Sequence, residues 1–170
     1  MKLIVCVSEN WGIGYNNLSF KGLKTDLKRF KQMTLNKTVI MGMNTFVSLN
    51  YKPLPNRKNI VLTSNTNMVS EYDNLIFCNT KQEVLRYKDA DMFIIGGESI
   101  YKLFLPFCDI VYVTRVFANP PADKFMPILD ENVWKVTNES KSYFENNLEF
   151  KFLKYERKER RKLIPTWTII

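Results

Sequence analysis

Short apolar runs rich in β-branched residues alternate along this chain with segments whose apolar residues recur at helical spacing. The runs are apolar throughout, which is typical of strands buried on both faces of a parallel sheet. Such strands are expected at residues 3–7, 37–42, 59–64, 75–78, 92–97 and 109–116. Helices are expected from Thr25 onward and at residues 44–49, 81–87 and 98–107. The alternation predicts an α/β fold with a mainly parallel, twisted central sheet and helices on both faces.

The last third of the chain follows a different pattern. From Asp130 to Tyr155, apolar and polar residues alternate loosely, which predicts an antiparallel strand or hairpin at the C-terminal end of the sheet. Two other segments are expected to lie outside regular structure. The polar stretch Ser8–Lys24 is too long for a simple connection and predicts a loop that covers a site. Two prolines restrict residues 52–57 to a turn or extended chain.

The composition excludes several kinds of site. The 170 residues, 45% of them hydrophobic, suffice for one domain with a buried core. The chain has no histidine, and its cysteines Cys6, Cys78 and Cys108 lie far apart, so we expect no metal site, disulfide framework or Ser-His-Asp triad. Any proton transfer must therefore involve Asp, Glu, Lys, Tyr or Cys. No apolar run approaches the roughly 18 residues of a membrane helix, and the N-terminal segment lacks signal-peptide features, which predicts a cytoplasmic protein without membrane contact.

The charge is strongly positive, with a formal net value of +8. Six basic and two acidic residues gather in the segment Lys154–Lys162. A solvated tail is the favoured interpretation of this segment, because no basic face interleaved with aromatic residues indicates nucleic-acid binding. Elsewhere, the excess of Lys and Arg suits anionic small ligands such as phosphates and carboxylates.

Glycines stand at two junctions between an expected strand and an expected helix. Gly96 and Gly97 form one junction, and Gly42 begins the other, where Asn44 or Thr45 can cap the helix that follows. Such turns can hold phosphate groups at the start of a helix, or they can simply be tight turns that need a positive φ. Neither GxGxxG nor the P-loop pattern is present, so a dinucleotide would bind by a different route from the Rossmann fingerprint.

Two charged residues can be interpreted in two ways from their local sequence. Asp26 lies in the first turn of a helix whose apolar residues Leu27, Phe30 and Met33 are helically spaced, with Thr25 as the expected cap. It is either a helix-dipole acid or, if it faces an apolar pocket, a group of raised pKa that can hold a proton. Arg57 is either a surface charge or a bidentate clamp for a carboxylate.

The motifs in order resemble the dihydrofolate reductase family. They are IG at 13–14, DLKRF at 26–30, TVIMGMNTF at 38–46, PLPNRKNIVLTS at 53–64, IIGGESIY at 94–101, VYVTRV at 111–116 and ADKFMP at 122–127. The resemblance covers residues 1 to about 156 and implies the same fold class for one domain. We therefore expect a reductase-like domain at 1–158 and a basic and apolar C-terminal extension of unknown role at 159–170.

The resemblance implies an enzyme that reduces 7,8-dihydrofolate to tetrahydrofolate by hydride transfer from NADPH. Asp26 would promote protonation of the pterin, and Thr114 would support Asp26 by hydrogen bonding. The implied substrate-binding residues are Ile4, Cys6, Leu27, Phe30, Leu49, Arg57 and Ile95. The implied cofactor-binding residues are Cys6, Ile13, Gly14, Gly42, Asn44, Thr45, Leu62, Thr63, Ser64, Ile95, Gly96, Gly97 and Tyr101. The expected partner is a small-molecule substrate, bound by a monomer without nucleic acid.

The sequence departs from the family pattern at two places. Ser19, Phe20 and Lys21 stand where the family usually has Leu-Pro-Trp, and Lys21 either pairs with Asp26 and lowers its pKa or points to solvent. The second interpretation is favoured because burying an ammonium group is costly. Met43 stands where a basic residue commonly contacts the cofactor phosphates, which makes the preference for NADPH over NADH an open question.

Two alternatives share this resemblance. One is a pyrimidine reductase of riboflavin synthesis, which would need neither Asp26 in the pterin-binding helix nor Arg57. The other is a reductase-like protein with a binding or structural role and weak or no folate activity, for which the replaced tryptophan and Met43 are the support.

Overall fold

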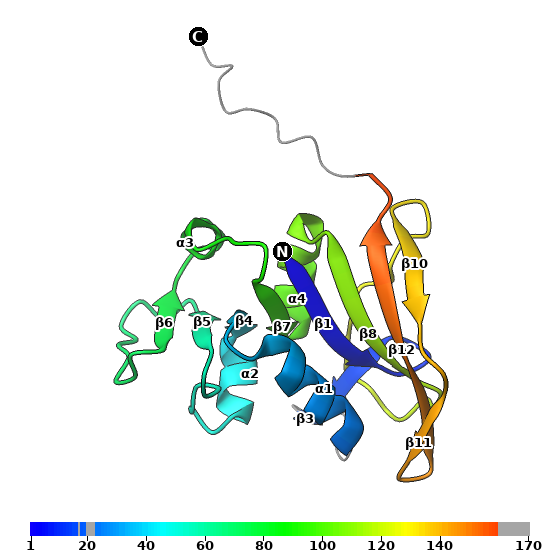
Figure 1. The fold of residues 1–170 in the computed structure, drawn as a ribbon. Helices are drawn as coiled ribbons and strands as arrows, with labels where there is room; N and C mark the ends of the chain where they lie inside the picture. The colour runs from blue at the N-terminus through cyan, green and yellow to red at the C-terminus, as the bar shows by residue number, and fades with distance from the viewer. Residues whose placement is uncertain (17, 20–22, 160–170) are drawn as a thin grey trace.

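The computed structural model describes residues 1–16, 18–19 and 23–159, which form one large mixed sheet, one small sheet and four α-helices (Figure 1). The large sheet runs in the order β10-β12-β8-β1-β7-β4-β5-β6, and β11 pairs with β12. Its strands are β1 (Lys2–Val7), β4 (Thr38–Gly42), β5 (Lys58–Leu62), β6 (Leu75–Cys78), β7 (Phe93–Gly96), β8 (Ile110–Val116), β10 (Trp134–Glu139), β11 (Tyr143–Glu145) and β12 (Leu148–Arg157). The helices are α1 (Lys24–Thr34), α2 (Met43–Ser48), α3 (Lys81–Arg86) and α4 (Glu98–Phe104), with a 3₁₀ turn at Leu105–Phe107.

The direction of the strands confirms the predicted fold class. From β8 across β1, β7, β4 and β5 to β6, every neighbouring pair is parallel. Strand β12 is antiparallel to β8, and β10 and β11 are antiparallel to β12. The parallel strands are the continuous apolar runs, as expected for strands covered on both faces, and all five residues of β4 are buried.

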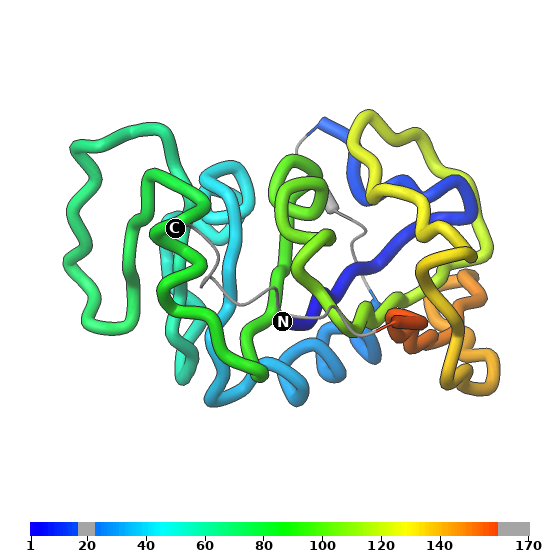
Figure 2. Tube along the Cα trace, turned by 90° about the horizontal axis from the view of Figure 1, so that it is seen from above, coloured from blue at the N-terminus to red at the C-terminus, as the bar shows by residue number. Residues whose placement is uncertain are grey.

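Helices cover both faces of the sheet (Figures 1 and 2). On one face, residues of α1 and α2 pack against the strand residues Val39 and Met41. On the other face, residues of α3 and α4 pack against Ile40 and Ile94. Successive residues of a strand point to opposite faces, so β4 contributes to both cores. Figure 2 shows α1 and α4 on opposite sides of β1.

The expected loop Ser8–Lys24 contains strands that the sequence pattern did not predict. Strands β2 (Gly12–Tyr15) and β3 (Leu18–Ser19) pair with each other, and β2 also pairs with β9 (Lys124–Phe125), to make the small sheet. A loop prediction is reasonable here because glycine is rare in strands and two of these strands are only two residues long. Gly12 is required by close packing, since a Cβ there would lie 2.6 Å from the Cβ of Ala122. Phe20 and Lys21 lie outside the described residues, so the two interpretations of Lys21 stay open.

The predicted helix caps are wrong. Helix α1 begins at Lys24 with Leu23 at the N-cap position, and no side chain at that position accepts a hydrogen bond from the helix. Thr25 is therefore inside the helix. Helix α2 begins at Met43, and its N-cap residue is Gly42, so neither Asn44 nor Thr45 caps it. For α1 the acceptor comes instead from strand β11, which a local pattern cannot reveal.

None of the helices in the described part of the chain is long and apolar enough to cross a membrane. The expected C-terminal extension at 159–170 lies, apart from Glu159, outside the described residues.

Candidate active site

Asp26 is held against the sheet by one short hydrogen bond. The hydroxyl of Thr114 on β8 donates to Oδ1 of Asp26 over 2.6 Å, although the two residues are 88 positions apart in the sequence. Thr114 is fully buried. Its neighbour on β1 is Cys6, by the register of the parallel β1–β8 pair. The structure thus brings Asp26, Thr114 and Cys6 together.

The surroundings of Asp26 favour its protonated form. Burial raises the pKa of Asp26 above its usual value, and the nearby carboxylate of Glu145 adds to this effect, whereas the Thr114 hydrogen bond and the charge of Arg29 oppose it. Burial, helped by the charge of Asp26, also raises the pKa of the Cys6 thiol. A carboxyl group with a raised pKa can hold a proton closer to neutral pH than an ordinary aspartate.

An apolar surface adjoins this acid. Ile4, Phe30, Leu49 and Ile95 belong to, or pack against, the same hydrophobic cluster on the α1 face of the sheet. Leu27 does not share this packing, since it is 62% exposed. An exposed leucine next to a half-buried carboxyl group offers an apolar surface to a ligand.

Arg57 is buried rather than a surface charge. Only 6% of it is exposed, and burial lowers the pKa of its guanidinium. Its Nε donates to the carbonyl oxygen of Pro55 over 3.0 Å, and its Nη1 donates to Oγ1 of Thr34 over 3.1 Å. Thr34 in turn donates to the carbonyl oxygen of Phe30 over 2.8 Å. These bonds fix the Arg57 guanidinium at the C-terminal end of α1.

The two glycine turns lie side by side, because β4 and β7 are parallel neighbours and Met41 pairs with Gly96. Gly96 has a φ of +129°, which side-chain-bearing residues rarely adopt. A Cβ added to Gly96 or Gly97 would lie 3.5 Å from the hydroxyl of Thr45, so this hydroxyl faces both glycines. Gly42 has a packing role, since a Cβ there would lie 2.9 Å from Cγ1 of Ile100.

Tyr101 ties this turn to the first strand. Its hydroxyl donates toward the carbonyl oxygens of Ile4 and Ile95, at 3.0 and 2.9 Å. Its side chain is buried, and burial raises the pKa of the phenol. Because the hydroxyl bonds to both backbones, Tyr101 links Ile4, in the middle of β1, to Ile95, near the end of β7.

Most of the other expected cofactor residues lie at or near the carboxyl ends of the parallel strands, and two lie on the small sheet. Leu62 ends β5, Thr63 follows with its Oγ1 accepting from the N–H of Asn65 over 3.1 Å, and Ser64 is exposed. Ile13 and Gly14 lie on β2, and Asn44 is exposed on α2. Met43 packs against the apolar cluster beneath α2.

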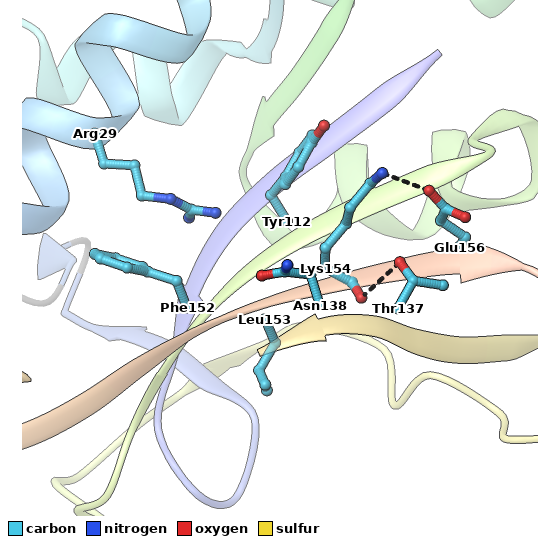
Figure 3. A pocket seen from close by; sticks show the side chains of 8 residues that line it. All are labelled: Arg29, Tyr112, Thr137, Asn138, Phe152, Leu153, Lys154 and Glu156. Carbon is cyan, nitrogen blue, oxygen red and sulfur yellow. Dashed lines mark hydrogen bonds and ion pairs between the residues drawn. The ribbon is translucent and has the colours of Figure 1, made fainter. Parts of the chain in front are cut away.

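Sequence reasoning missed two charged residues around Asp26, namely Arg29 and Glu145. The Arg29 guanidinium lies 4.3 Å from the ring centre of Phe152 and 5.7 Å from that of Tyr112. Its Nη1 is buried and has no hydrogen-bond partner among the described residues. Figure 3 shows it extending from α1 toward these two rings, beside a cavity of about 360 Å³ that Lys154 and Glu156 also line. The spacing of three residues from Asp26 could have indicated Arg29, whereas no local signal indicates Glu145.

No group of three or more His, Cys, Asp or Glu in the described residues could hold a metal ion.

Comparisons with known proteins agree with this geometry. A family model described as "Dihydrofolate reductase" matches residues 1–157. The dihydrofolate reductase of Bacillus subtilis (strain 168) is 34% identical over 166 residues, which cover 95% of this chain and 97% of that protein. The dihydrofolate reductase of Haemophilus influenzae is 33% identical over 160 residues, covering 92% and 98%. The solved structure of dihydrofolate reductase from Enterococcus faecalis complexed with NADP(H) and RAB-propyl superimposes with a TM-score of 0.83 at 29% identity, covering 93% of this chain and 96% of that chain.

Proposed function

The chain belongs to the dihydrofolate reductase family and reduces 7,8-dihydrofolate to tetrahydrofolate with NADPH, and we propose that Asp26 promotes protonation of the pterin in this reaction. The hydrogen bond of 2.6 Å from Thr114 to the partly buried Asp26 is the observation that carries the proposal. Membership in the family, together with the hydrogen-bonded pair Asp26 and Thr114, favours this function over a pyrimidine reductase and over a purely structural role.

The residues around the glycine turns suit NADPH, which supplies the hydride when it is bound. Gly96, Gly97 and Thr45 would hold the pyrophosphate, because a turn without Cβ atoms next to a hydroxyl leaves the backbone open to phosphate oxygens. The start of α2 at Gly42 and Asn44 would adjoin it. Leu62, Thr63 and Ser64, at the end of the neighbouring strand, would contact the adenosine end. Cys6, Ile13, Gly14 and Ile95 would surround the nicotinamide, and Tyr101 would keep β1 and β7 in register beneath it.

The substrate would lie between Asp26 and Arg57, which flank the apolar face of α1. The Asp26 carboxyl group would hold the amino group and a ring nitrogen of the pterin. Ile4, Leu27, Phe30 and Leu49 would contact the pterin and the aromatic ring that follows it. Arg57 would bind the glutamate α-carboxylate, which is supported by the two hydrogen bonds that orient its guanidinium.

The raised pKa of Asp26 predicts how the rate of the reaction depends on pH. Protonated Asp26 is the form that can promote protonation of the substrate, and burial extends this form toward neutral pH. Thr114 fixes Oδ1 and with it the orientation of the carboxyl group. The rate should therefore fall as the pH rises above the pKa of Asp26.

The decisive experiment mixes purified protein with NADPH and dihydrofolate and follows the loss of NADPH absorbance across a pH series. Asp26→Asn should lower kcat at neutral pH by about 100-fold or more, the usual size for loss of an acid–base group, and should remove the fall of rate with pH. Asp91→Asn is the matched control, because Asp91 is paired with Lys2 and Lys37 away from the site. Wild-type rates and pH dependence in Asp26→Asn would rule Asp26 out. Repeating the series with NADH measures the cofactor preference that Met43 leaves open.

We further propose that the chain acts as a cytoplasmic monomer without a nucleic-acid partner, and that residues 159–170 extend a reductase domain at 1–158. The free thiols of Cys6, Cys78 and Cys108 support a reducing compartment. Several lysines are paired with carboxylates at separate places in the fold, as with Lys102 and Glu98 within α4 and Lys151 and Glu139 between β12 and β10. These lysines are therefore not gathered in one basic stripe. Light scattering of the full chain, with and without nucleic acid, tests the first proposal, and truncation after Lys158 tests the second.

A further inference from the structure

The first turn of α1 receives its hydrogen-bond acceptor from a distant part of the chain. A helix begins with N–H groups that have no partner inside the helix, and a side chain at the N-cap position usually accepts from them. Leu23 stands at that position and has no acceptor. Instead, the carboxylate of Glu145 accepts from the N–H of Lys24 through Oε1 and from the N–H of Thr25, over 3.1 Å, through Oε2. Glu145 is 120 positions away from Thr25 in the sequence.

The sheet fixes the place of Glu145. It is the last residue of β11, where it pairs with Leu148 of β12, and the rings of Tyr143 and Phe150 stack across the same two strands with centres 5.6 Å apart. Strand β12 continues along β8, where Phe152 pairs with Thr114. One strand therefore links the cap of α1 to the residue that binds the side chain of Asp26.

We propose that Glu145 is a positioning residue for Asp26: its carboxylate caps α1 from hairpin β11–β12 and so holds the Asp26 carboxyl group against Thr114. The proposal rests on the proposed role of Asp26 in protonation. Asp26 is the third residue of α1, immediately after the two capped N–H groups. A shift at the start of the helix would therefore act directly on the Asp26–Thr114 distance and on the burial of the acid.

Charged and titratable groups reach Asp26 from several elements. Arg29 comes from α1 itself, Cys6 from β1, Tyr101 from α4 and Glu145 from β11. The hydrogen bonds with Thr25 and Lys24 lower the pKa of Glu145, which favours its ionised form. Its negative charge raises the pKa of Asp26, in opposition to Arg29. Loss of the cap would also let water reach Asp26, so both effects of removing Glu145 lower the pKa of the acid.

Steady-state rates across a pH series, measured for E145A and E145Q with E149Q as control, test the proposal. Glu149 is a carboxylate on the same hairpin that accepts from Ser142 and makes no bond to α1. E145A should lower kcat at neutral pH by about fivefold, the size expected for loss of one helix N-cap, with a smaller change in KM. As the pH is raised, the rate of E145A should begin to fall at a lower pH than the rate of the wild type. E145Q keeps one oxygen acceptor but has no charge. Its rate should therefore approach that of the wild type at acidic pH, and the pH at which its rate begins to fall should be lowered as in E145A.

Two results would overturn the proposal. One is a pH profile of E145A and E145Q that matches those of E149Q and the wild type. The other is a loss of rate that is equal at every pH, because a structural defect alone would produce it. Should E145A fail to fold in a thermal melt, the profile of E145Q decides. This test is separate from the test of Asp26. Wild-type activity in Asp26→Asn would refute the role of the acid. Inactive Asp26→Asn together with wild-type pH profiles in E145A and E145Q would refute only the role of Glu145.

Discussion

Thr114→Val isolates the hydrogen bond on which the proposed acid depends. Valine and threonine have nearly the same shape, so the fully buried site on β8 keeps its packing. The Oγ1 that donates to Asp26 over 2.6 Å is replaced by a methyl group, and the carboxyl group loses this donor. The substitution therefore changes one interaction, between two atoms whose separation is known.

The size of the effect follows from the charge of the acceptor. A buried hydrogen bond to a charged group contributes about 1.5–3 kcal/mol, and one between neutral groups about 0.5–1.5 kcal/mol. In the folded protein, Asp26 is ionised at pH values above its raised pKa. Below the ordinary aspartate pKa it is neutral in both the folded and the unfolded chain. Thr114→Val should thus lower the free energy of unfolding by the larger amount at high pH and by the smaller amount at low pH. Linkage gives the same direction for this change in stability. The Thr114 hydrogen bond lowers the pKa of Asp26, so its loss raises that pKa further in the folded state. The free energy of unfolding then falls more steeply as the pH rises.

Urea unfolding at about pH 3.5, below the ordinary aspartate pKa, and at about pH 9 measures this difference. Thr38→Val is the matched control, since Thr38 is a buried threonine on β4 that is 9% exposed. In the rate series, Thr114→Val should move the fall of activity to higher pH. A loss of stability that is the same at both pH values, or that Thr38→Val reproduces, would refute the reasoning.

Two other substitutions test the remaining parts of the site. Arg57→Ala should raise KM for dihydrofolate with a smaller change in kcat, because a clamp on the glutamate contributes mainly uniform binding; an unchanged KM in steady-state assays would remove Arg57 from the site. Gly96→Ala should raise KM for NADPH relative to the wild type. It should also lower the free energy of unfolding by about 1–3 kcal/mol, the usual range for a side chain forced into a disfavoured φ. A wild-type urea midpoint for Gly96→Ala would contradict the requirement for glycine.

The parallel part of the fold could be predicted because each strand carries its own evidence. A run such as Thr38–Gly42 is buried on both faces, so its uniform apolar character reports its place in the sheet directly. The small sheet gave no such signal, since β2 contains two glycines and β3 and β9 are each two residues long. The pairing of these strands depends on their partner strands and on the close packing at Gly12, and a local sequence pattern contains information on neither.

The site shows the same division between local and distant information. Asp26 could be predicted as a candidate because the helix around it is visible in the sequence, and the glycines could be predicted from their place after strands. The burial of Arg57 depends on Thr34 and Pro55, and the cap of α1 depends on Glu145, so these features arise only when the chain has folded. For the same reason, the local sequence predicts Thr25 as the cap of α1, whereas Glu145 accepts the hydrogen bonds at the start of this helix.

The distance of Glu145 from α1 has a consequence for biosynthesis. Proteins leave the ribosome N-terminus first, and an isolated helix of the length of α1 is marginal in water. Helix α1 therefore emerges with neither its cap nor the partner of its acid, because Thr114 follows Asp26 by 88 residues and Glu145 follows Thr25 by 120. The environment that raises the pKa of Asp26 forms only after β12 has joined β8. A nascent chain thus carries an ordinary aspartate, and the pKa of this group rises only as the surrounding strands assemble around it.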